Sequence, residues 1–223
     1  CVTIDMNSEQ VLTYIKDKLI QGIELIDLPL SQLQQSSLVQ YLVLLEKWNK
    51  TYNLTAIRDI RQMLVQHVLD SLVVIPHLPL NGADVRFLDV GSGAGLPGVP
   101  IAIACPEVRV TMLDSNQKKT AFMQHAIGEL RLKNVNVVCA RVEDWKSEER
   151  FQIITSRAYS ELKLFVEQTT HLLKQDGIFA AMKGQFPKEE IEALPASYVV
   201  CNVIKLNVPG MNAERHLVLV TRK

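Results

Sequence analysis

Apolar residues in the first eighty positions recur every three to four residues, which is the spacing of amphipathic helices. The first such stripe ends where Asp27-Leu28-Pro29 breaks the pattern. Ser31 and Gln34 then have the spacing of a capping box, which predicts the start of a second helix. A third helix is predicted from about Asp59 until Pro76. The apolar faces of these helices comprise Val11, Leu12, Ile15, Leu19 and Ile23; Leu38, Leu42, Leu45 and Trp48; and Leu64, Val68, Leu72 and Ile75.

From about residue 85 the pattern changes to short apolar runs that alternate with helical stretches. Strands are predicted over 85–90, 108–114, 135–140, 151–155 and 178–182, with the last one following an Asp176-Gly177 turn, and helices over 99–105, 117–130 and 160–173. Alternation of this kind indicates βαβ units and a parallel sheet.

The C-terminal part of the chain has a different pattern. The runs 198–206 and 216–221 are joined by Val208-Pro209-Gly210 with no helix between them, so they are predicted to form an antiparallel pair. The fold class is therefore α/β: a Rossmann-like, mostly parallel seven-stranded sheet with an antiparallel C-terminal strand pair and an N-terminal helical extension. We expect the extension to occupy 1–80 and the core, as one compact unit, 81–223.

The first predicted strand leads into a glycine-rich loop, Leu88-Asp89-Val90-Gly91-Ser92-Gly93-Ala94-Gly95. Glycine tolerates positive φ and lets the backbone approach a ligand closely. Gly91-x-Gly93-x-Gly95 suits a nucleoside cofactor such as S-adenosylmethionine, whereas Gly93-x-Gly95-x-x-Gly98 matches the dinucleotide fingerprint. Pro97 and Pro100 favour the nucleoside, because proline lacks the N–H that a pyrophosphate at a helix N-terminus would need.

Four further positions extend this predicted cofactor site. Asp89 precedes the first glycine, where its carboxylate would meet the amino acid end of the cofactor or order the loop. Asp114 ends the second predicted strand, and a carboxylate there can accept both ribose hydroxyl protons. Val142 and Glu143 follow the third predicted strand, beside the crevice at the switch point, where they would flank an adenine.

The charge balance limits how the chain can contact nucleic acid. The sequence has 24 basic and 24 acidic residues, so any RNA binding has to use a local patch. Arg141, Arg157, Lys183 and Arg215 lie at or near predicted strand ends, where such a patch could hold phosphate groups. Arg157 is the best candidate, since its strand finishes at the crevice; a structural salt bridge is the alternative.

Other features of the sequence limit the partners that we expect for the chain. The first thirty residues do not resemble a signal peptide, and no run of about 18 apolar residues exists, so we expect a cytoplasmic protein without a membrane partner. The cysteines at 1, 105, 139 and 201 lack zinc spacing, which predicts free thiols and no metal. His67 and Asp70 supply too few ligands for a metal and are expected to fix their helix by hydrogen bonding.

No surplus apolar stripe is evident in the sequence, which favours a monomer. Whether the residues before Met6 are native stays open.

Several motifs occur together and in order along the chain. They are Trp48-Asn49-Lys50-x-Tyr52-Asn53-Leu54-Thr55, His67-x-x-Asp70-Ser71, Leu88-Asp89-Val90-Gly91-Ser92-Gly93-Ala94-Gly95-Leu96-Pro97-Gly98-x-Pro100, Ser156-Arg157-Ala158 and Lys183-Gly184. From about residue 10 to the C-terminus, the set resembles the glucose-inhibited division protein B family, the ribosomal RNA small subunit methyltransferases G. The resemblance implies a class I S-adenosylmethionine-dependent methyltransferase fold and a bacterial cytoplasmic enzyme. Its substrate would be N7 of one guanine in 16S ribosomal RNA, either free or within the small ribosomal subunit.

The resemblance also implies cofactor contacts at Gly91, Leu96, Val142, Glu143 and Arg157. Guanine N7 carries a lone pair and no proton, so its methylation needs no general base and relies on alignment and exclusion of water. The alternatives are a small-molecule methyltransferase, an NAD-linked oxidoreductase and a non-catalytic nucleoside-sensing module. Residues 176–223 leave little room for the substrate domain that an oxidoreductase would need.

Overall fold

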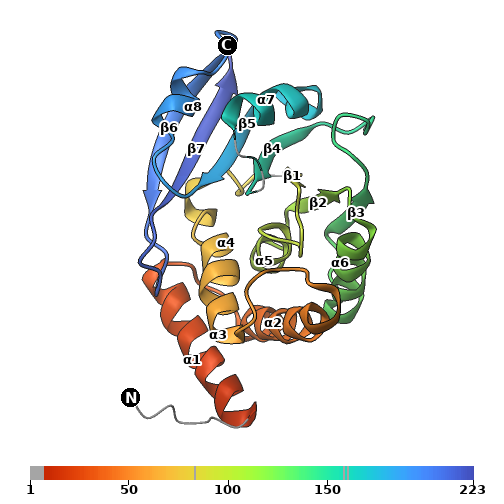
Figure 1. Cartoon of the computed structure of the whole chain (residues 1–223), viewed down its shortest axis with the longest axis vertical. Coiled ribbons are helices and arrows are strands. Elements are labelled where there is room, and N and C mark those ends of the chain that lie inside the picture. The colour runs from red at the N-terminus through yellow and green to blue at the C-terminus, as the bar shows by residue number, and fades with distance from the viewer. Residues whose placement is uncertain (1–7, 83, 158, 160) are drawn as a thin grey trace.

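A computed structural model describes residues 8–82, 84–157, 159 and 161–223, arranged around one seven-stranded sheet (Figure 1). The strand order is β3-β2-β1-β4-β5-β7-β6. The strands are β1 (Arg86–Val90), β2 (Arg109–Asp114), β3 (Val135–Cys139), β4 (Phe151–Ser156), β5 (Leu173–Lys183), β6 (Tyr198–Leu206) and β7 (Arg215–Arg222). Strands β1 to β5 pair in parallel, and β7 pairs antiparallel with both β5 and β6. The predicted mostly parallel sheet with an antiparallel C-terminal pair is confirmed.

Helices cover both faces of this sheet. They are α1 (Ser8–Leu25), α2 (Gln32–Tyr52), α3 (Ile60–Met63), the π-helix η1 (Leu64–Leu69), α4 (Asp70–Leu72), the 3₁₀-helix η2 (Ile75–His77), α5 (Gly98–Ala104), α6 (Gln117–Leu130), α7 (Leu162–Thr169), the 3₁₀-helix η3 (Thr170–Leu172) and α8 (Lys188–Glu192). In Figure 1, α7 and α8 lie above the sheet, and α1 to α6 lie below it. No helix in the described part of the chain is long and apolar enough to cross a membrane.

Successive side chains of the central strands enter two different cores. Phe87 packs in the core shared with the N-terminal helices, and its neighbour Leu88 packs in the core under α7. This alternation follows from the period of two of a β-strand, and burial on both faces explains why β1 is almost continuously apolar. The parallel strands therefore need helices on both sides.

The predicted N-terminal extension shares its core with the sheet. Buried residues on both sides of position 80, such as Leu42 and Val99, belong to one hydrophobic cluster. Gln34 completes the predicted capping box and also donates its side-chain amide to the carbonyls of Ile103 and Ala104, at the end of α5. The Tyr41 hydroxyl donates to the Ala94 carbonyl at 2.7 Å, so α2 directly supports the glycine loop.

Three sequence predictions about elements need correction. Strand β5 begins at Leu173 rather than 178, because the Asp176-Gly177 segment lies at a register shift inside the strand instead of at a turn before it. The helix predicted over 160–173 is α7 followed by the 3₁₀ turn η3. The third helix is split by the π-helix η1, a geometry found frequently at functional sites. The short helix α8 was not predicted.

Candidate functional site

The glycine loop after β1 is held against the end of β2 by its own backbone. Gly91, Gly93 and Gly95 have φ of 72°, 59° and 87°. The N–H groups of Gly91 and Ser92 donate to the Leu113 carbonyl, and the Gly93 N–H donates to Oδ2 of Asp114 at 2.8 Å. The left-handed conformation explains why glycine occupies these three positions.

The glycines have different surroundings. A Cβ added to Gly93 would meet no atom nearer than the Gly91 carbonyl oxygen at 4.0 Å, so the loop is open there. A Cβ on Gly95 would lie 2.7 Å from Cγ2 of Val99, and one on Gly98 would lie 2.6 Å from Met112. Gly93 thus leaves room for a ligand, whereas Gly95 and Gly98 allow close packing of α5 on β2.

The N-terminus of α5 has no place for a pyrophosphate. The Gly98 N–H donates to Oδ2 of Asp89 at 2.9 Å, and the N–H groups of Val99 and Ile101 donate to the Gly95 and Pro97 carbonyls. Pro100 has no N–H to donate. The dinucleotide mode, in which these donors bind phosphate oxygens, is therefore excluded at this helix, and the nucleoside interpretation remains.

Asp89 orders the loop from inside the protein. Its side chain is fully buried, and Oδ1 has no hydrogen-bond partner among the described residues. Burial raises the pKa of this carboxyl to about 7, opposed by the hydrogen bond from Gly98. Of the two roles considered for Asp89 from the sequence, the observed contacts supply loop ordering.

A cleft of about 360 Å³, the Asp114 cavity, lies beside the loop at the carboxyl ends of β1, β2 and β3. It is lined by Val90, Gly91, Leu113, Asp114, Ser115, Lys119, Ala140, Arg141, Val142, Glu143 and Tyr159. The oxygens of Asp114 accept one N–H each, from Gly93 and Asn116, although a carboxylate offers about four acceptor sites. Lone pairs therefore remain for a pair of ribose hydroxyls, and the residues present fit an adenosine.

A smaller cavity of about 180 Å³, the Thr55 cavity, also borders the loop. It is lined by Leu54, Thr55, His67, Gly91, Ser92, Gly93, Ala94, Leu96 and Arg157. Asn49 holds its wall in place by accepting from the Thr55 N–H and donating to the Ile57 carbonyl, both at 2.9 Å. Leu54 and Thr55 of the Trp48–Thr55 motif thus form a wall beside the glycine loop, which was not evident from the sequence.

His67 links this wall to the π-helix. Its Nε2 lies 2.9 Å from the Thr55 hydroxyl, which agrees with the predicted role of fixing its helix by hydrogen bonding. Burial, with a smaller effect from the Arg157 guanidinium, lowers the pKa of His67 to about 4. The imidazole is therefore neutral near pH 7 and adds no charge to the site.

The carboxylate of Asp70 forms salt bridges with two of the predicted cations. Its side chain is only 2% exposed, and its oxygens lie 3.1 Å from Nη1 of Arg157 and 3.0 Å from Nε of Arg215. These three residues line the Asp70 cavity, about 360 Å³, together with Ile57, Gln66, His67, Met182, Lys183 and Gly184. The salt bridge considered for Arg157 from the sequence is therefore present, and the residue also lines this cavity; its role toward RNA stays a prediction.

Arg157 lies at the topological switch point of the sheet. Strands β1 and β4 are neighbours whose onward connections diverge, and the Ser156 hydroxyl donates to the Val90 carbonyl at 2.7 Å across their ends. Ligands of doubly wound sheets bind in the crevice at this position. Arg157 lines the Thr55 cavity, the Asp70 cavity and a third one, so it marks where they meet.

The third hollow, the Phe186 cavity, has a volume of about 620 Å³. It is lined by Arg157, Tyr159, Met182, Lys183, Gly184, Gln185, Phe186, Pro187, Lys188, Glu189 and Glu190. Nζ of Lys183 lies 2.6 Å from Oε2 of Glu190 and donates to the Tyr159 carbonyl at 3.1 Å. Tyr159 also lines the Asp114 cavity, which connects the two regions.

The structure brings together three of the four predicted cations. Arg157, Lys183 and Arg215 line the Asp70 cavity, but Arg141 lines the Asp114 cavity with its side chain 72% exposed and 3.7 Å from Glu143. Three cavity-lining residues were not predicted from the sequence: Tyr159, Phe186 and Glu190. The sequence marks them only by their position, because each follows a predicted strand end or a family motif by a few residues.

The strand order β3-β2-β1-β4-β5-β7-β6, with β7 antiparallel to its neighbours, is that of a class I S-adenosylmethionine-dependent methyltransferase. A family model described as GidB, rRNA small subunit methyltransferase G, matches residues 34–218. The chain therefore belongs to the ribosomal RNA small subunit methyltransferase G family, which confirms the resemblance seen in its motifs.

Curated relatives agree with this assignment. The chain is 50% identical over 208 residues to ribosomal RNA small subunit methyltransferase G of Neisseria meningitidis serogroup B, covering 93% of this chain and 99% of that protein. It is 51% identical over 201 residues to the protein of the same name from Chromobacterium violaceum, covering 90% and 95%.

Solved structures share the fold at low sequence identity. TrmN from Thermus thermophilus has a TM-score of 0.55 at 16% identity, covering 72% of this chain and 53% of that chain. TYW2 from M. jannaschii in complex with AdoMet has a TM-score of 0.50 at 16% identity, covering 64% and 71%.

Proposed function

We propose that the protein transfers the methyl group of S-adenosylmethionine to N7 of one guanine in 16S ribosomal RNA. The observation that carries this proposal is the position of Arg157, which lines both the loop-side Thr55 cavity and the two larger cavities beyond it. A methyl donor on the glycine loop and a base in the larger cavities would meet at this residue. Membership in an rRNA methyltransferase family supports the RNA as acceptor.

Binding of the cofactor is assigned to the loop side of the cleft. Gly91, Gly93 and Leu96 would hold the amino acid end, and Asp114 would accept from the ribose hydroxyls. Val142, which is buried, and the backbone at Glu143 would flank the adenine. When bound, S-adenosylmethionine supplies a methyl group on a sulfonium, which is electrophilic without further activation.

Catalysis requires little acid–base chemistry from the protein. Guanine N7 has a lone pair and no proton to lose, so the chain has to align the base, exclude water and neutralise nearby RNA phosphates. The lining of the Asp70 cavity contains three basic residues, Arg157, Lys183 and Arg215, and one acidic residue, Asp70. The cavity is therefore basic, although the whole chain has no net charge. Arg141 would contact RNA or cofactor only at the exposed rim of the Asp114 cavity.

We also propose that the protein acts in the cytoplasm as a monomer, on 16S rRNA that is free or within the small ribosomal subunit. The absence of a membrane-crossing helix in the described residues and the rRNA relatives support this location. No group of three or more His, Cys, Asp or Glu in the described residues is placed to hold a metal, and N7 methylation does not call for one.

Methyl transfer can be tested directly. Labelled S-adenosylmethionine is incubated with small-subunit RNA, or with subunits, from cells lacking the activity, and the products are digested to nucleosides. Label in 7-methylguanosine at one position is expected, and Asp114→Asn should reduce its rate at low cofactor concentration. Binding of the cofactor without label in RNA would contradict the proposal and direct attention to small-molecule acceptors.

A further inference from the structure

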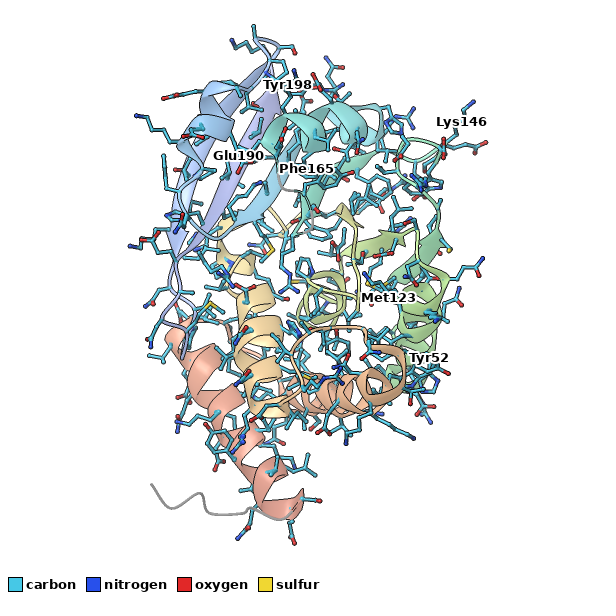
Figure 2. The ribbon with its side chains drawn as sticks, viewed as in Figure 1. Tyr52, Met123, Lys146, Phe165, Glu190 and Tyr198 are labelled. Atoms are coloured by element: carbon cyan, nitrogen blue, oxygen red, sulfur yellow. The ribbon has the colours of Figure 1, made fainter. Side chains whose placement is uncertain are left out.

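Glu190, which belongs to α8 and is labelled in Figure 2, lines the Phe186 cavity. Its Oε2 accepts from Nζ of Lys183 at 2.6 Å and from the Leu162 N–H at 2.8 Å, so both lone pairs of that oxygen are used. Oε1 has no hydrogen-bond partner in the described ranges of the chain. The side chain is 25% exposed, which leaves Oε1 within reach of a ligand.

Two contacts hold this carboxylate in one orientation. The ammonium of Lys183 is itself almost buried, with 9% of its side chain exposed, and it pairs with Glu190 across the cavity wall. Leu162 is the first residue of α7, where the partial positive charge of a helix N-terminus also favours an anion. Glu190 is therefore a fixed acceptor rather than a mobile surface carboxylate.

An aromatic ring lines the same cavity. The Phe186 side chain is 53% exposed, although it is large and apolar. Its ring stands edge-to-face with His216, at a centroid distance of 5.8 Å and an interplanar angle of 84°. His216 is in turn anchored to the Gly184 carbonyl at 2.8 Å. Proteins that bind single unpaired bases use exposed, fixed aromatic rings in this way, as surfaces for stacking.

We propose that the Phe186 cavity receives the acceptor base and that Glu190 recognises it as guanine. Oε1 accepts from N1–H and the 2-amino group, which are adjacent donors on the Watson–Crick edge, while Phe186 stacks on the base. Adenine presents a lone pair at N1, which a carboxylate repels. The inference rests on the proposed function and adds to it the residue that selects the base.

Asp70, the acid that lines the neighbouring cavity, is less suited than Glu190 to recognise the base. Both oxygens of Asp70 are already paired with arginines, and the residue is buried. Holding the Watson–Crick edge also leaves N7 unobstructed, because N7 belongs to the other ring. Base-modifying enzymes commonly extrude a nucleotide and bind its Watson–Crick edge while an aromatic residue stacks on it.

The test combines a variant of the protein with a variant of the base. In Glu190→Gln, the amide oxygen can keep the contacts with Lys183 and Leu162, and the amide nitrogen replaces Oε1 with a donor. Small subunits are reconstituted from 16S rRNA carrying guanosine or inosine, which lacks the 2-amino group, at the methylated position. The unmodified protein should prefer guanosine about 10-fold in kcat/KM; the variant should lose about 10- to 100-fold on guanosine and retain no preference.

Matched variants separate recognition from structure. Glu192→Gln removes the same charge from the same helix, where Glu192 pairs with exposed Lys188 at 3.9 Å, and should behave like the unmodified protein. Phe186→Leu should lower kcat/KM about 5- to 100-fold on guanosine and inosine alike, since stacking does not use the 2-amino group. The Kd of the cofactor should change in none of these variants.

The possible outcomes distinguish a failure of this inference from a failure of the proposed function on which it rests. If the unmodified protein methylates guanosine RNA but Glu190→Gln loses activity equally on both bases, Glu190 does not recognise the base and the inference is wrong. Equal use of guanosine and inosine by the unmodified protein would overturn it in the same way. Failure of the unmodified protein to methylate guanosine RNA would overturn both the proposed function and this assignment.

Discussion

The two halves of the cleft are built in different ways. On the loop side, contacts come from a continuous stretch, Asp89 to Asp114, and most are made by backbone N–H groups that follow β1. On the other side, the contacts are made by side chains that are far apart in sequence: Asp70 binds Arg157, 87 residues away, and Arg215, 145 residues away. The first half is local and the second depends on the complete sheet (Figure 1).

Because the two halves are built differently, different substitutions should impair the ligand binding of each half. A loop built from backbone is sensitive to added Cβ atoms and to the carboxylates that receive its N–H groups. A cluster built from side chains depends on the one buried carboxylate that its cations share. Changes at Asp70 should therefore affect the RNA side, and changes at Asp114 or the glycines should affect the cofactor side.

The largest effect is expected from Asp70→Ala. The substitution leaves the Arg157 and Arg215 guanidiniums, which are partly buried, without their shared anion. Breaking such a pair costs about 3–5 kcal/mol, so the free energy of unfolding in urea should fall by that order, with a loss of methyl transfer to RNA. Glu46→Ala, which breaks the exposed pair with Lys50, should cost less than about 1 kcal/mol. Equal stability of the two variants would contradict the anchoring role of Asp70.

A pH-dependent effect is expected from Asp89. Burial raises its pKa in the folded protein to about 7 from the ordinary 3.8, so the folded state binds this proton more tightly than the unfolded state. The associated stability is present below about pH 4 and is lost as the pH rises to about 7. Asp89→Asn does not titrate, so between pH 4 and pH 8 its stability relative to the unmodified protein should rise by up to about 4 kcal/mol. Urea unfolding at both pH values measures this; a constant difference would show that Asp89 is ionised as usual.

Asp114→Asn tests the loop side without disturbing the other half. It removes a charged acceptor that binds the Gly93 N–H and that we assign to the ribose. Hydrogen bonds to charged groups contribute about 1.5–3 kcal/mol, so the Kd for S-adenosylmethionine measured by calorimetry should rise about 10- to 100-fold. RNA binding should be unchanged. Asp144→Asn, an exposed acid outside the cavity lining, is the matched control and should leave the Kd as it is.

The smallest and most discriminating effects are expected from two glycines. Gly95→Ala places a Cβ 2.7 Å from Val99 at a φ of +87°, and overpacking of this kind costs about 1–3 kcal/mol of stability. Gly93→Ala meets open space at a φ of +59°, so it should cost about 1–2 kcal/mol and act mainly by weakening cofactor binding. Melting temperatures with and without the cofactor separate the two. The same response from both variants would argue against Gly93 as the ligand-facing position.

Much of the fold could be predicted because its signals are local. The capping box at Ser31 and Gln34, the apolar runs of the parallel strands and the antiparallel C-terminal pair all occur where periodicity and turn residues predict them. The glycine loop is also local, since the loop and Asp114 belong to consecutive strands. Its predicted role in cofactor binding stays a prediction until the Asp114 and Gly93 variants are measured.

The remaining features depend on contacts that no local pattern encodes. Strand β5 begins at Leu173 because Leu173 already pairs with Phe151 before the register shift, and a short helix such as α8 is too brief to have a periodic signal. Arg141 and Arg215 look equivalent along the chain, yet only Arg215 reaches Asp70. The insertion of β7 between β5 and β6 produces that encounter.

The sequence by itself determined the class of fold, the glycine loop and the family, because those features are written in short contiguous stretches. The tertiary structure decided which cations share a carboxylate, where the cavities meet at Arg157, and that Glu190 offers an oxygen to the Phe186 cavity. The physical reason is that side-chain chemistry at a sheet edge depends on strand order. Strand order brings together residues whose separation in the chain carries no information about their contact.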